Sequence, residues 1–464
     1  MSETATTSEQ PQLKRVMGPK LLLLFIVGDV IGTGVYALTG KVAAEVGGAA
    51  WLPFLVAFTV AIITAFSYLE LVTKYPHAAG ASLYVHKAFG IHFFTFMVGF
   101  AVMSSGLTSA STAARAFASN LAVAFGIDAG NTLIMLLALG FMVLVMALNF
   151  RGASESVKTN VVLTLVELSG LVLVILVSFY AIAHGNADWS RVVAFQTPAH
   201  KNVFLAVTTA TSLAFFAMVG FEDSVNMAEE IKDPVRIFPK TMVTGLSITA
   251  VIYVLVSICA VAIVPVGELA ASDTPLTVVV KRAAPGIPMG TLLPIISMFA
   301  VANTALINMM MASRLLYGMS KEAVLPPFLS RVHRTTRTPY AAIFFTTGLA
   351  FALIIYVSYA SENAVLVLGG TTALLLLAVF AVVNVAVLVL RRDPVTHDHF
   401  VAKTPLPVIG AIACLYLVTP LSGRDGLQYE VAGLLLGLGI ILWAITWFAN
   451  RALRGQRKDP TDLD

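Results

Sequence analysis

The sequence predicts an all-α integral membrane protein with about twelve transmembrane helices, and three observations lead to this fold class. First, 58% of the 464 residues are hydrophobic and only 12% are charged, whereas a soluble domain has about 25% charged residues. Second, apolar runs of about twenty residues, the length that crosses a bilayer, recur along the chain. Third, no connection between the runs is long enough to hold a soluble domain. We therefore expect one multi-pass domain in a lipid bilayer.

The apolar runs give the order of the predicted helices. The third and eighth runs are longer than the roughly 20 residues that one crossing needs, so both helices should tilt strongly or extend beyond the bilayer. We expect transmembrane helices at approximately 21–45, 50–72, 89–125, 131–149, 160–183, 203–229, 241–265, 289–318, 341–360, 363–390, 407–421 and 430–450.

Basic residues predict how the chain is oriented. With both termini in the cytoplasm, 21 of the 29 Lys and Arg residues fall on the cytoplasmic side and six on the opposite side. Because short cytoplasmic loops carry an excess of Lys and Arg, we expect a cell-membrane protein with cytoplasmic tails at 1–20 and 451–464. The polar N-terminal stretch shows no apolar core of a signal peptide. The net charge of +4 is spread over short loops, so nucleic acid is not expected as a partner.

The first predicted helix is interrupted by the segment Gly28–Gly40, which contains four glycines and Asp29. Glycine weakens a helix by roughly 0.5–1 kcal/mol relative to alanine. Unsatisfied backbone groups in lipid cost several kcal/mol, so a break at this depth must face protein or a watery cavity. We interpret Gly32-Thr33-Gly34 as an unwound point whose N–H groups hold an anionic group of a substrate. The alternative is that small residues only allow close helix packing.

A second break lies in the sixth run, where Gly220 precedes the adjacent carboxylates Glu222 and Asp223. Charged residues at this depth are costly and usually line a pathway. The first and sixth runs begin two five-helix halves, 21–183 and 203–390, and the segment 391–450 supplies helices 11 and 12. Because five is odd, the second half enters the membrane from the opposite face. Interrupted helices at corresponding positions of two inverted halves point to a transporter site near the midplane.

Several separate stretches resemble one family of membrane proteins. The segment Gly32-Thr33-Gly34-Val35-Tyr36 resembles the Gly-small-Gly-hydrophobic-aromatic motif of the amino acid–polyamine–organocation (APC) superfamily. Gly220-Phe221-Glu222 and the segment from Ala228 to Arg236 are similar to the sixth-helix signature of that family. Further similar stretches are Tyr68–Leu71, Tyr75-Pro76, Ala88–Gly90, and Ala312–Met319 with Pro326. The similarity runs from about Leu21 to Arg392 and does not specify one substrate.

The resemblance implies the leucine-transporter fold with 5+5 inverted repeats, and a permease that moves an amino acid or related amine by alternating access. By position, the N–H groups of the first break would meet the substrate carboxylate, and carbonyls of the second break would receive its ammonium group. Phe216 falls where related proteins keep an aromatic lid over the substrate. We expect Gly34→Val and Gly220→Val each to abolish substrate binding without unfolding the protein, because each adds bulk where the backbone must meet the ligand. The expected substrate-binding residues are Gly32, Thr33, Gly34, Phe216, Ala217, Val219 and Gly220.

The resemblance also suggests a coupling residue. In proton-coupled relatives a lysine on the fifth helix occupies the place that a sodium ion fills in sodium-coupled ones, and here this place holds Glu167. At ~1.5 Å per residue, Glu167 and Asp29 would lie about 12 and 13 Å deep, and two close carboxyls do not both ionise easily. We expect Glu167 to couple a proton to symport or exchange; sodium held by its carboxylate, or a purely structural glutamate, are the alternatives. The candidate coupling or gating residues are Asp29, Glu167, Glu222 and Asp223.

Other function classes find less support in the sequence. Asp29 motivates an inorganic-cation transporter, because carboxylates with freed carbonyls also form cation sites. An enzyme is not expected, since the chain has no His-Glu-x-x-His or Gly-x-Ser-x-Gly motif. The absence of Gly-x-x-x-x-Gly-Lys-Ser/Thr argues against ATP-driven transport. Neither a cofactor nor a resident metal is expected, and the expected partners are the substrate, a proton and the bilayer.

Overall fold

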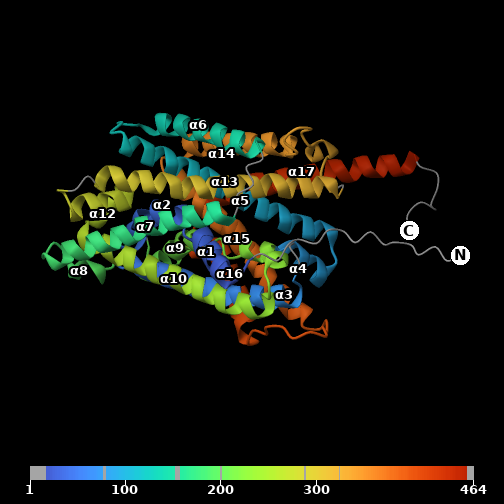
Figure 1. Ribbon diagram of the computed structural model, residues 1–464, viewed down its shortest axis with the longest axis horizontal. Helices are drawn as coiled ribbons and strands as arrows, with labels where there is room; N and C mark the ends of the chain where they lie inside the picture. Colours follow the sequence, from blue (N-terminus) through green and yellow to red (C-terminus); the bar gives the residue numbers. More distant parts are fainter. Residues whose placement is uncertain are drawn as a thin grey trace.

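The structure is a computed structural model that describes residues 17–76, 80–151, 157–198, 201–286, 289–322 and 324–456. Within these ranges the chain is helical and contains no strand, only two isolated β-bridges. Most of the long helices run roughly along the long axis of an elongated bundle (Figure 1). The all-α prediction is confirmed for this part of the chain. The predicted tails lie mostly outside it.

The helices follow one another with short connections. In chain order they are α1 (Pro19–Val30), α2 (Thr33–Val46), α3 (Trp51–Lys74), α4 (Gly80–Phe89), α5 (His92–Ala124), α6 (Asn131–Phe150), α7 (Val157–Ala183), α8 (Trp189–Val192), α9 (Val203–Ala214), the 3-10 helices η1 (Phe215–Met218) and η2 (Asp223–Glu230), α10 (Pro234–Ile263), α11 (Val266–Ala271), α12 (Pro275–Ala283), α13 (Met289–Lys321), η3 (Pro327–Ser330), α14 (Tyr340–Ala360), α15 (Ala364–Leu390), α16 (Pro405–Val418), η4 (Pro420–Ser422) and α17 (Gly426–Gln456).

The number of membrane crossings is close to the predicted one. Ten helices in the described chain are long and apolar enough to cross a bilayer, and one of them, Val203–Asn226, joins α9 to η1 and part of η2. The pair α1 and α2, bent by 41° at the first break, would make an eleventh. Helix α16 is apolar but only 14 residues long. The chain is therefore a multi-pass membrane protein, and the count of twelve stays a prediction.

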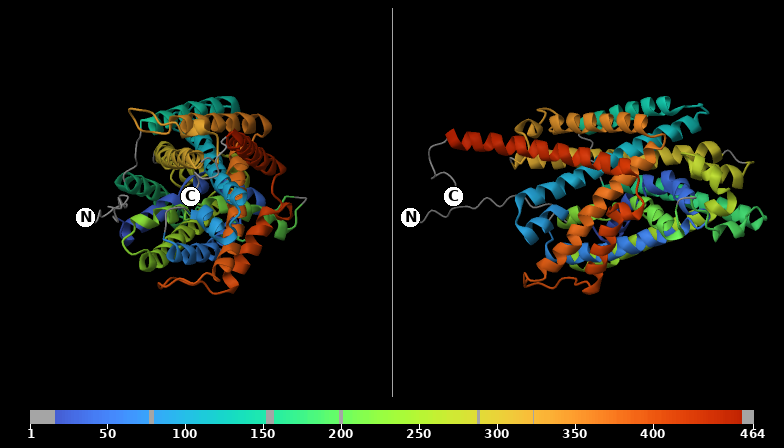
Figure 2. Two further views of the ribbon diagram at one scale, coloured as in Figure 1. Left: turned by 90° about the vertical axis from the view of Figure 1, so that its right-hand side faces the viewer. Right: turned by 180° about the vertical axis from the view of Figure 1, so that it is seen from behind.

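The interrupted helices lie among the most buried elements of the bundle. In the most apolar stretch of α15, 72% of residues are buried, and the value is 67% for both α5 and the span Val203–Asn226. The corresponding value is only 28% for α17 and 39% for α6, which lies at the edge of the bundle in Figure 2. Helix α2 packs against α9, and α5 packs along both α13 and α15. Lipid therefore faces α6 and α17, whereas protein surrounds the breaks.

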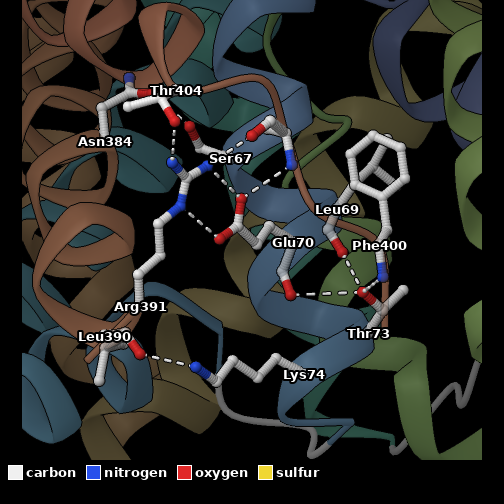
Figure 3. A network of polar contacts seen from close by, with 11 residues as sticks. Ser67, Leu69, Glu70, Thr73, Lys74, Asn384, Leu390, Arg391, Phe400 and Thr404 are labelled. Carbon is white, nitrogen blue, oxygen red and sulfur yellow. Dashed lines mark hydrogen bonds and ion pairs between the residues drawn. The ribbon is translucent and has the colours of Figure 1, made fainter. Parts of the chain in front are cut away.

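A polar network fixes the connection between α15 and α16 to the end of α3 (Figure 3). The carboxylate of Glu70, which is 1% exposed, accepts hydrogen bonds from Nε and Nη2 of Arg391 at 2.8 and 2.7 Å and from the N–H of Ala402 at 2.9 Å. This bond to Glu70 raises the pKa of Arg391. One turn further along α3, Lys74 donates to the carbonyl of Leu390 at 2.6 Å. The network holds α3 and α15, two helices that flank the second break, in one register.

Candidate binding pocket between two interrupted helices

The first break separates α1 from α2 by two residues, Ile31 and Gly32. Gly32 has φ −128° and ψ −144°, outside the helical region, so the N–H groups of the first turn of α2 have no preceding helix to bond. Tyr253 on α10 donates its hydroxyl to the carbonyl of Val30 at 2.7 Å, which satisfies one of the carbonyls at the end of α1. The break therefore places the positive N-terminal end of α2, a 14-residue helix, beside the C-terminal end of α1, which the bond from Tyr253 holds in place.

The second break begins where α9 tightens into η1 and ends at Gly220. Val219 is extended, with φ −76° and ψ 149°, and Gly220 has φ +121°, a conformation that a side chain rarely allows. The N–H of Gly220 donates to Oε2 of Glu222 at 2.9 Å. The α-helical part of the span Val203–Asn226 is thus interrupted at Val219 and Gly220.

The two breaks are in direct contact. A Cβ placed on Gly220 would lie 2.7 Å from the carbonyl oxygen of Asp29, and a Cβ on Gly34 would lie 2.5 Å from the Cα of Ala217. Both distances are shorter than real Cβ contacts, so only glycine allows this approach at either position. Gly34→Val would consequently force the two helices apart. The expectation that this substitution abolishes binding without unfolding the protein stays a prediction, and the contact with Ala217 means that it would also disturb the packing of the two helices.

A pocket lies where the two breaks meet. It is lined from the first break by Asp29, Gly32, Thr33 and Gly34, and from the second by Phe216, Val219, Gly220, Glu222 and Asp223. Ala217 does not line this pocket but packs under Gly34, and Glu167 does not line it either. The free space is about 50 Å³, enough for a few water molecules. An amino acid with a side chain therefore requires the lining to rearrange.

Three further helices complete the lining with small polar groups that sequence reasoning missed. They come from α5, α13 and α15, and Thr372 of α15 bonds Thr108 of α5 through their hydroxyls at 2.7 Å. A run of Ser, Gly and Thr within the long third apolar segment was the available signal. The polar and small residues that these helices contribute to the pocket are Ser105, Gly106, Ser109, Thr304, Asn308 and Thr372.

The charges around the pocket are all acidic. Within the described chain, Asp29, Glu222 and Asp223 are the charged residues of the lining, and no Lys, Arg or His contributes to it. Glu222 is 7% exposed. The hydroxyl of Thr33 is buried and has no hydrogen-bond partner among the described residues. The pocket thus combines a helix N-terminus and a hydroxyl, which suit an anionic group, with carboxylates and free carbonyls, which suit a cationic one.

Glu167 lies on α7, directly behind the first break. It is fully buried, and its backbone carbonyl accepts a hydrogen bond from the hydroxyl of Tyr36 at 2.7 Å. One turn earlier on α7, Thr164 fills the space beside Gly28, where a Cβ would lie 1.8 Å from its hydroxyl oxygen. Helix α7 therefore packs against the chain on both sides of the break: Thr164 contacts Gly28 of α1, and the backbone of Glu167 is bonded to Tyr36 in the first turn of α2.

Two interrupted helices that meet at a polar pocket inside a membrane bundle define, as a class, a membrane transporter. Comparison with known proteins gives the family: residues 21–428 match the model of the Amino acid permease family, and the chain belongs to this family. It is therefore a transporter and not an enzyme. The APC resemblance expected from the sequence is thereby confirmed.

The relatives agree with this assignment. The chain is 27% identical to the branched-chain amino acid permease BcaP of Bacillus subtilis, with 94% of each chain covered. It is 28% identical to the methylthioribose transporter of the same organism, with 91% of this chain and 92% of the relative covered. It is 27% identical to cationic amino acid transporter 3, mitochondrial, of Arabidopsis thaliana, over 83% of this chain and 64% of the relative. These comparisons support amino acid transport and give no support to the inorganic-cation alternative.

Proposed function

We propose that the chain is a secondary transporter that binds an amino acid or related amine between its two breaks and releases it by alternating access. The observation that carries the proposal is the contact of the two breaks, which brings a helix N-terminus and a set of freed carbonyls to one pocket. A zwitterion needs N–H donors at its carboxylate and oxygen acceptors at its ammonium group, and the two breaks supply one each.

The roles of individual residues follow from where they lie. The N–H groups of Thr33 and Gly34, with the Thr33 hydroxyl, are placed to receive the carboxylate, and Gly32 leaves room for it. In this proposal the backbone carbonyls near the turn at Gly220 receive the ammonium group: those of Phe216 and Val219 in the lining, and that of Ala217 just beneath it. The ring of Phe216 is 5% exposed and lies within 3.4 Å of the Cβ position of Gly369 on α15, so it can cover a bound substrate. In this proposal Glu222 and Asp223 favour a cationic group and contribute to gating.

A substrate screen followed by one pair of variants tests this proposal. Thermal unfolding of the purified protein with single amino acids and polyamines identifies the ligand, because a ligand stabilises the state that binds it. Thr33→Val should then weaken binding of that ligand by about 10- to 150-fold, the effect of losing one hydrogen bond to a charged group. Thr39→Val on the same helix is the control, because its hydroxyl already bonds the carbonyl of Val35 at 2.6 Å. Equal affinities of the two variants for the ligand would show that the substrate carboxylate does not bind at the first break.

The proposed coupling ion is a proton, and Glu167 is the proposed carrier, with Asp29 as the carboxyl that could share it. Glu167 is fully buried behind the first break, where a change in its charge would act on α2 through Tyr36. Glu167→Gln should bind substrate but lose the acceleration that an inward proton gradient gives to uptake in liposomes. If the gradient accelerates uptake in the variant as in wild type, Glu167 is not the coupling residue. If Glu167→Gln instead keeps the acceleration by a proton gradient and loses an acceleration by a sodium gradient, the coupling ion is sodium.

The proposed architecture is that of two inverted five-helix repeats, each beginning with a broken helix. The first consists of α1 with α2, α3, α5, α6 and α7, and the second of α9 with its 3-10 helices, α10, α13, α14 and α15. Each set starts at one of the two breaks, which supports the repeat. We further propose that the protein lies in the cell membrane with both termini in the cytoplasm, as the distribution of Lys and Arg indicates.

A further inference from the structure

A second pocket lies apart from the one between the breaks and shares no lining residue with it. Four parts of the chain form this outer pocket: the end of α2, the second half of α9 with Lys201 just before the helix, the start of α15 and the connection from η4 to α17. Its free space is about 260 Å³, several times that of the pocket between the breaks. Its lining includes Ser212, Asn363 and Leu366, and its charged residues are Glu45, Lys201, Arg424 and Asp425. Asp425 accepts a hydrogen bond from the N–H of Leu427 at 2.9 Å.

Arg424 is a buried cation without an anionic partner. It is 8% exposed, and its Nε donates to the carbonyl of Leu417 at 2.6 Å. Its Nη1 donates to the carbonyl of Gly370 and to Oε1 of Gln428, each at 2.9 Å. All three acceptors are neutral, and no ion pair to Arg424 occurs among the described residues. Burial lowers the pKa of Arg424 to about 10, so the group is charged at neutral pH.

The guanidinium cannot easily turn away to find another partner. Gly423 holds a left-handed turn, with φ +80°, and a Cβ there would lie 2.2 Å from the hydroxyl oxygen of Thr209 on α9. A Cβ on Gly370 would lie 2.2 Å from Nε2 of Gln428, so this glycine makes room for the amide that bonds Arg424. Buried charges in proteins are normally paired, and leaving one unpaired is strongly destabilising. An anion bound beside the fixed guanidinium of Arg424 would therefore stabilise the protein.

Two more features of the outer pocket suit an anion. Nη2 of Arg424 and Oγ of Ser212 are both buried, and neither has a hydrogen-bond partner among the described residues. The N-terminus of the 27-residue helix α15 opens at the same pocket, with Asn363 as an N-cap that makes no side-chain cap bond and Leu366 in its first turn. The first-turn N–H groups of a helix attract negative charge. The other cation, Lys201, is already paired with Glu45 at 2.7 Å.

We propose that the outer pocket is a binding site for a small monovalent anion, held by Arg424, Ser212 and the N-terminus of α15. Chloride from the solution and the carboxylate of an amino acid share this chemistry. Because Ser212 lies near the end of α9, which leads directly into the second break, a bound anion would link this end of α9 to α15 and to the segment before α17. The site is independent of the substrate pocket, and its test can fail without affecting the proposed transport function.

The test is thermal unfolding of the purified full-length protein at constant ionic strength in sodium gluconate, with chloride, acetate or the amino acid found in the screen added in turn. We expect the unfolding midpoint to rise with added anion, and above the dissociation constant to rise with the logarithm of anion concentration. Chloride and acetate acting alike would identify a simple anion site. The amino acid also binds the proposed pocket between the breaks, so only the part of its effect that Asn363→Asp removes would identify its carboxylate as a ligand of the outer pocket.

Two variants and one control make the result specific. Arg424→Gln removes the cation, and Asn363→Asp keeps a good helix cap but places a negative charge at the pocket. Both should abolish the rise in midpoint that chloride and acetate give, and Asn363→Asp decides the question if Arg424→Gln fails to fold. Arg282→Gln, which changes a half-exposed arginine paired with Glu268, should retain the rise. Absence of a rise with chloride and with acetate in the wild type, or its survival in Asn363→Asp, would overturn the proposal.

Discussion

Replacing Gly220 with alanine is the smallest change that should separate the two breaks. Gly220 has φ +121°, and an added Cβ would lie 2.7 Å from the carbonyl oxygen of Asp29 and 3.1 Å from the backbone nitrogen of Val30. A side chain in such a backbone conformation costs about 1–3 kcal/mol. The end of α1 must move as well, because its backbone is what the Cβ meets. We therefore expect the rate of uptake to fall by about 5- to 150-fold, the range that corresponds to this free energy.

The assay is initial uptake of the identified amino acid into proteoliposomes, with the thermal midpoint of each variant measured in parallel. Gly140→Ala on α6 is the matched control: no atom lies within 4 Å of its Cβ position, and alanine favours a helix over glycine by about 0.5–1 kcal/mol. The control should transport at least as well as wild type. Wild-type uptake and midpoint in Gly220→Ala would refute the reasoning that the close contact of the breaks shapes the pocket.

Three further predictions follow from particular contacts. Glu70→Gln should lower the free energy of unfolding by about 1.5–3 kcal/mol, because the buried Glu70 carboxylate is the charged acceptor for Arg391, whose side chain is 22% exposed. Glu268→Gln, in a half-exposed pair, should change it by about 0–1 kcal/mol. Denaturant titration compares the two variants, and equal effects would contradict the network in Figure 3. Tyr253→Phe removes the donor to the carbonyl of Val30 and should lower the free energy of unfolding by about 1–3 kcal/mol. Uptake, measured on the same samples, should fall as well, and unchanged uptake would show that transport does not depend on this bond. In a background without Cys259 and Cys414, an impermeant thiol reagent should label a cysteine at Ser272 in intact cells but not one at Ser330, and labelling of Ser330 alone would reverse the proposed orientation.

The sequence alone was sufficient for the fold class and for both breaks, because these depend on local properties. Apolar length determines a membrane span. Gly32 and Gly220 mark places where the helix is weakened and where a break must be satisfied by protein or water. The structure places both glycines at interruptions, with Gly220 in a conformation that favours glycine. Six of the seven expected substrate residues line one pocket, and Ala217 lies just beneath it.

The rest could not be predicted, because it depends on contacts between segments far apart in the chain. Gly34 was expected to meet the substrate carboxylate, and no local pattern showed that its Cβ position is occupied by Ala217, 183 residues later in the chain. The polar residues of α5 and α13 join the pocket only because those helices pack along each other. Arg424 was counted simply as a basic residue on the outer side of the membrane. Its burial among neutral acceptors follows from the contacts of α9, α15 and α17, which no local pattern reveals.

The central claim is that the substrate binds between the two breaks, and a density map of the protein with the identified amino acid at saturating concentration tests it most directly. Our account predicts ligand density that reaches from the N–H groups of Thr33 and Gly34 to the carbonyls around Phe216 and Val219. The same map of Thr33→Val should show weaker density there. An empty pocket between the breaks, with ligand density in another part of the bundle, would contradict the account.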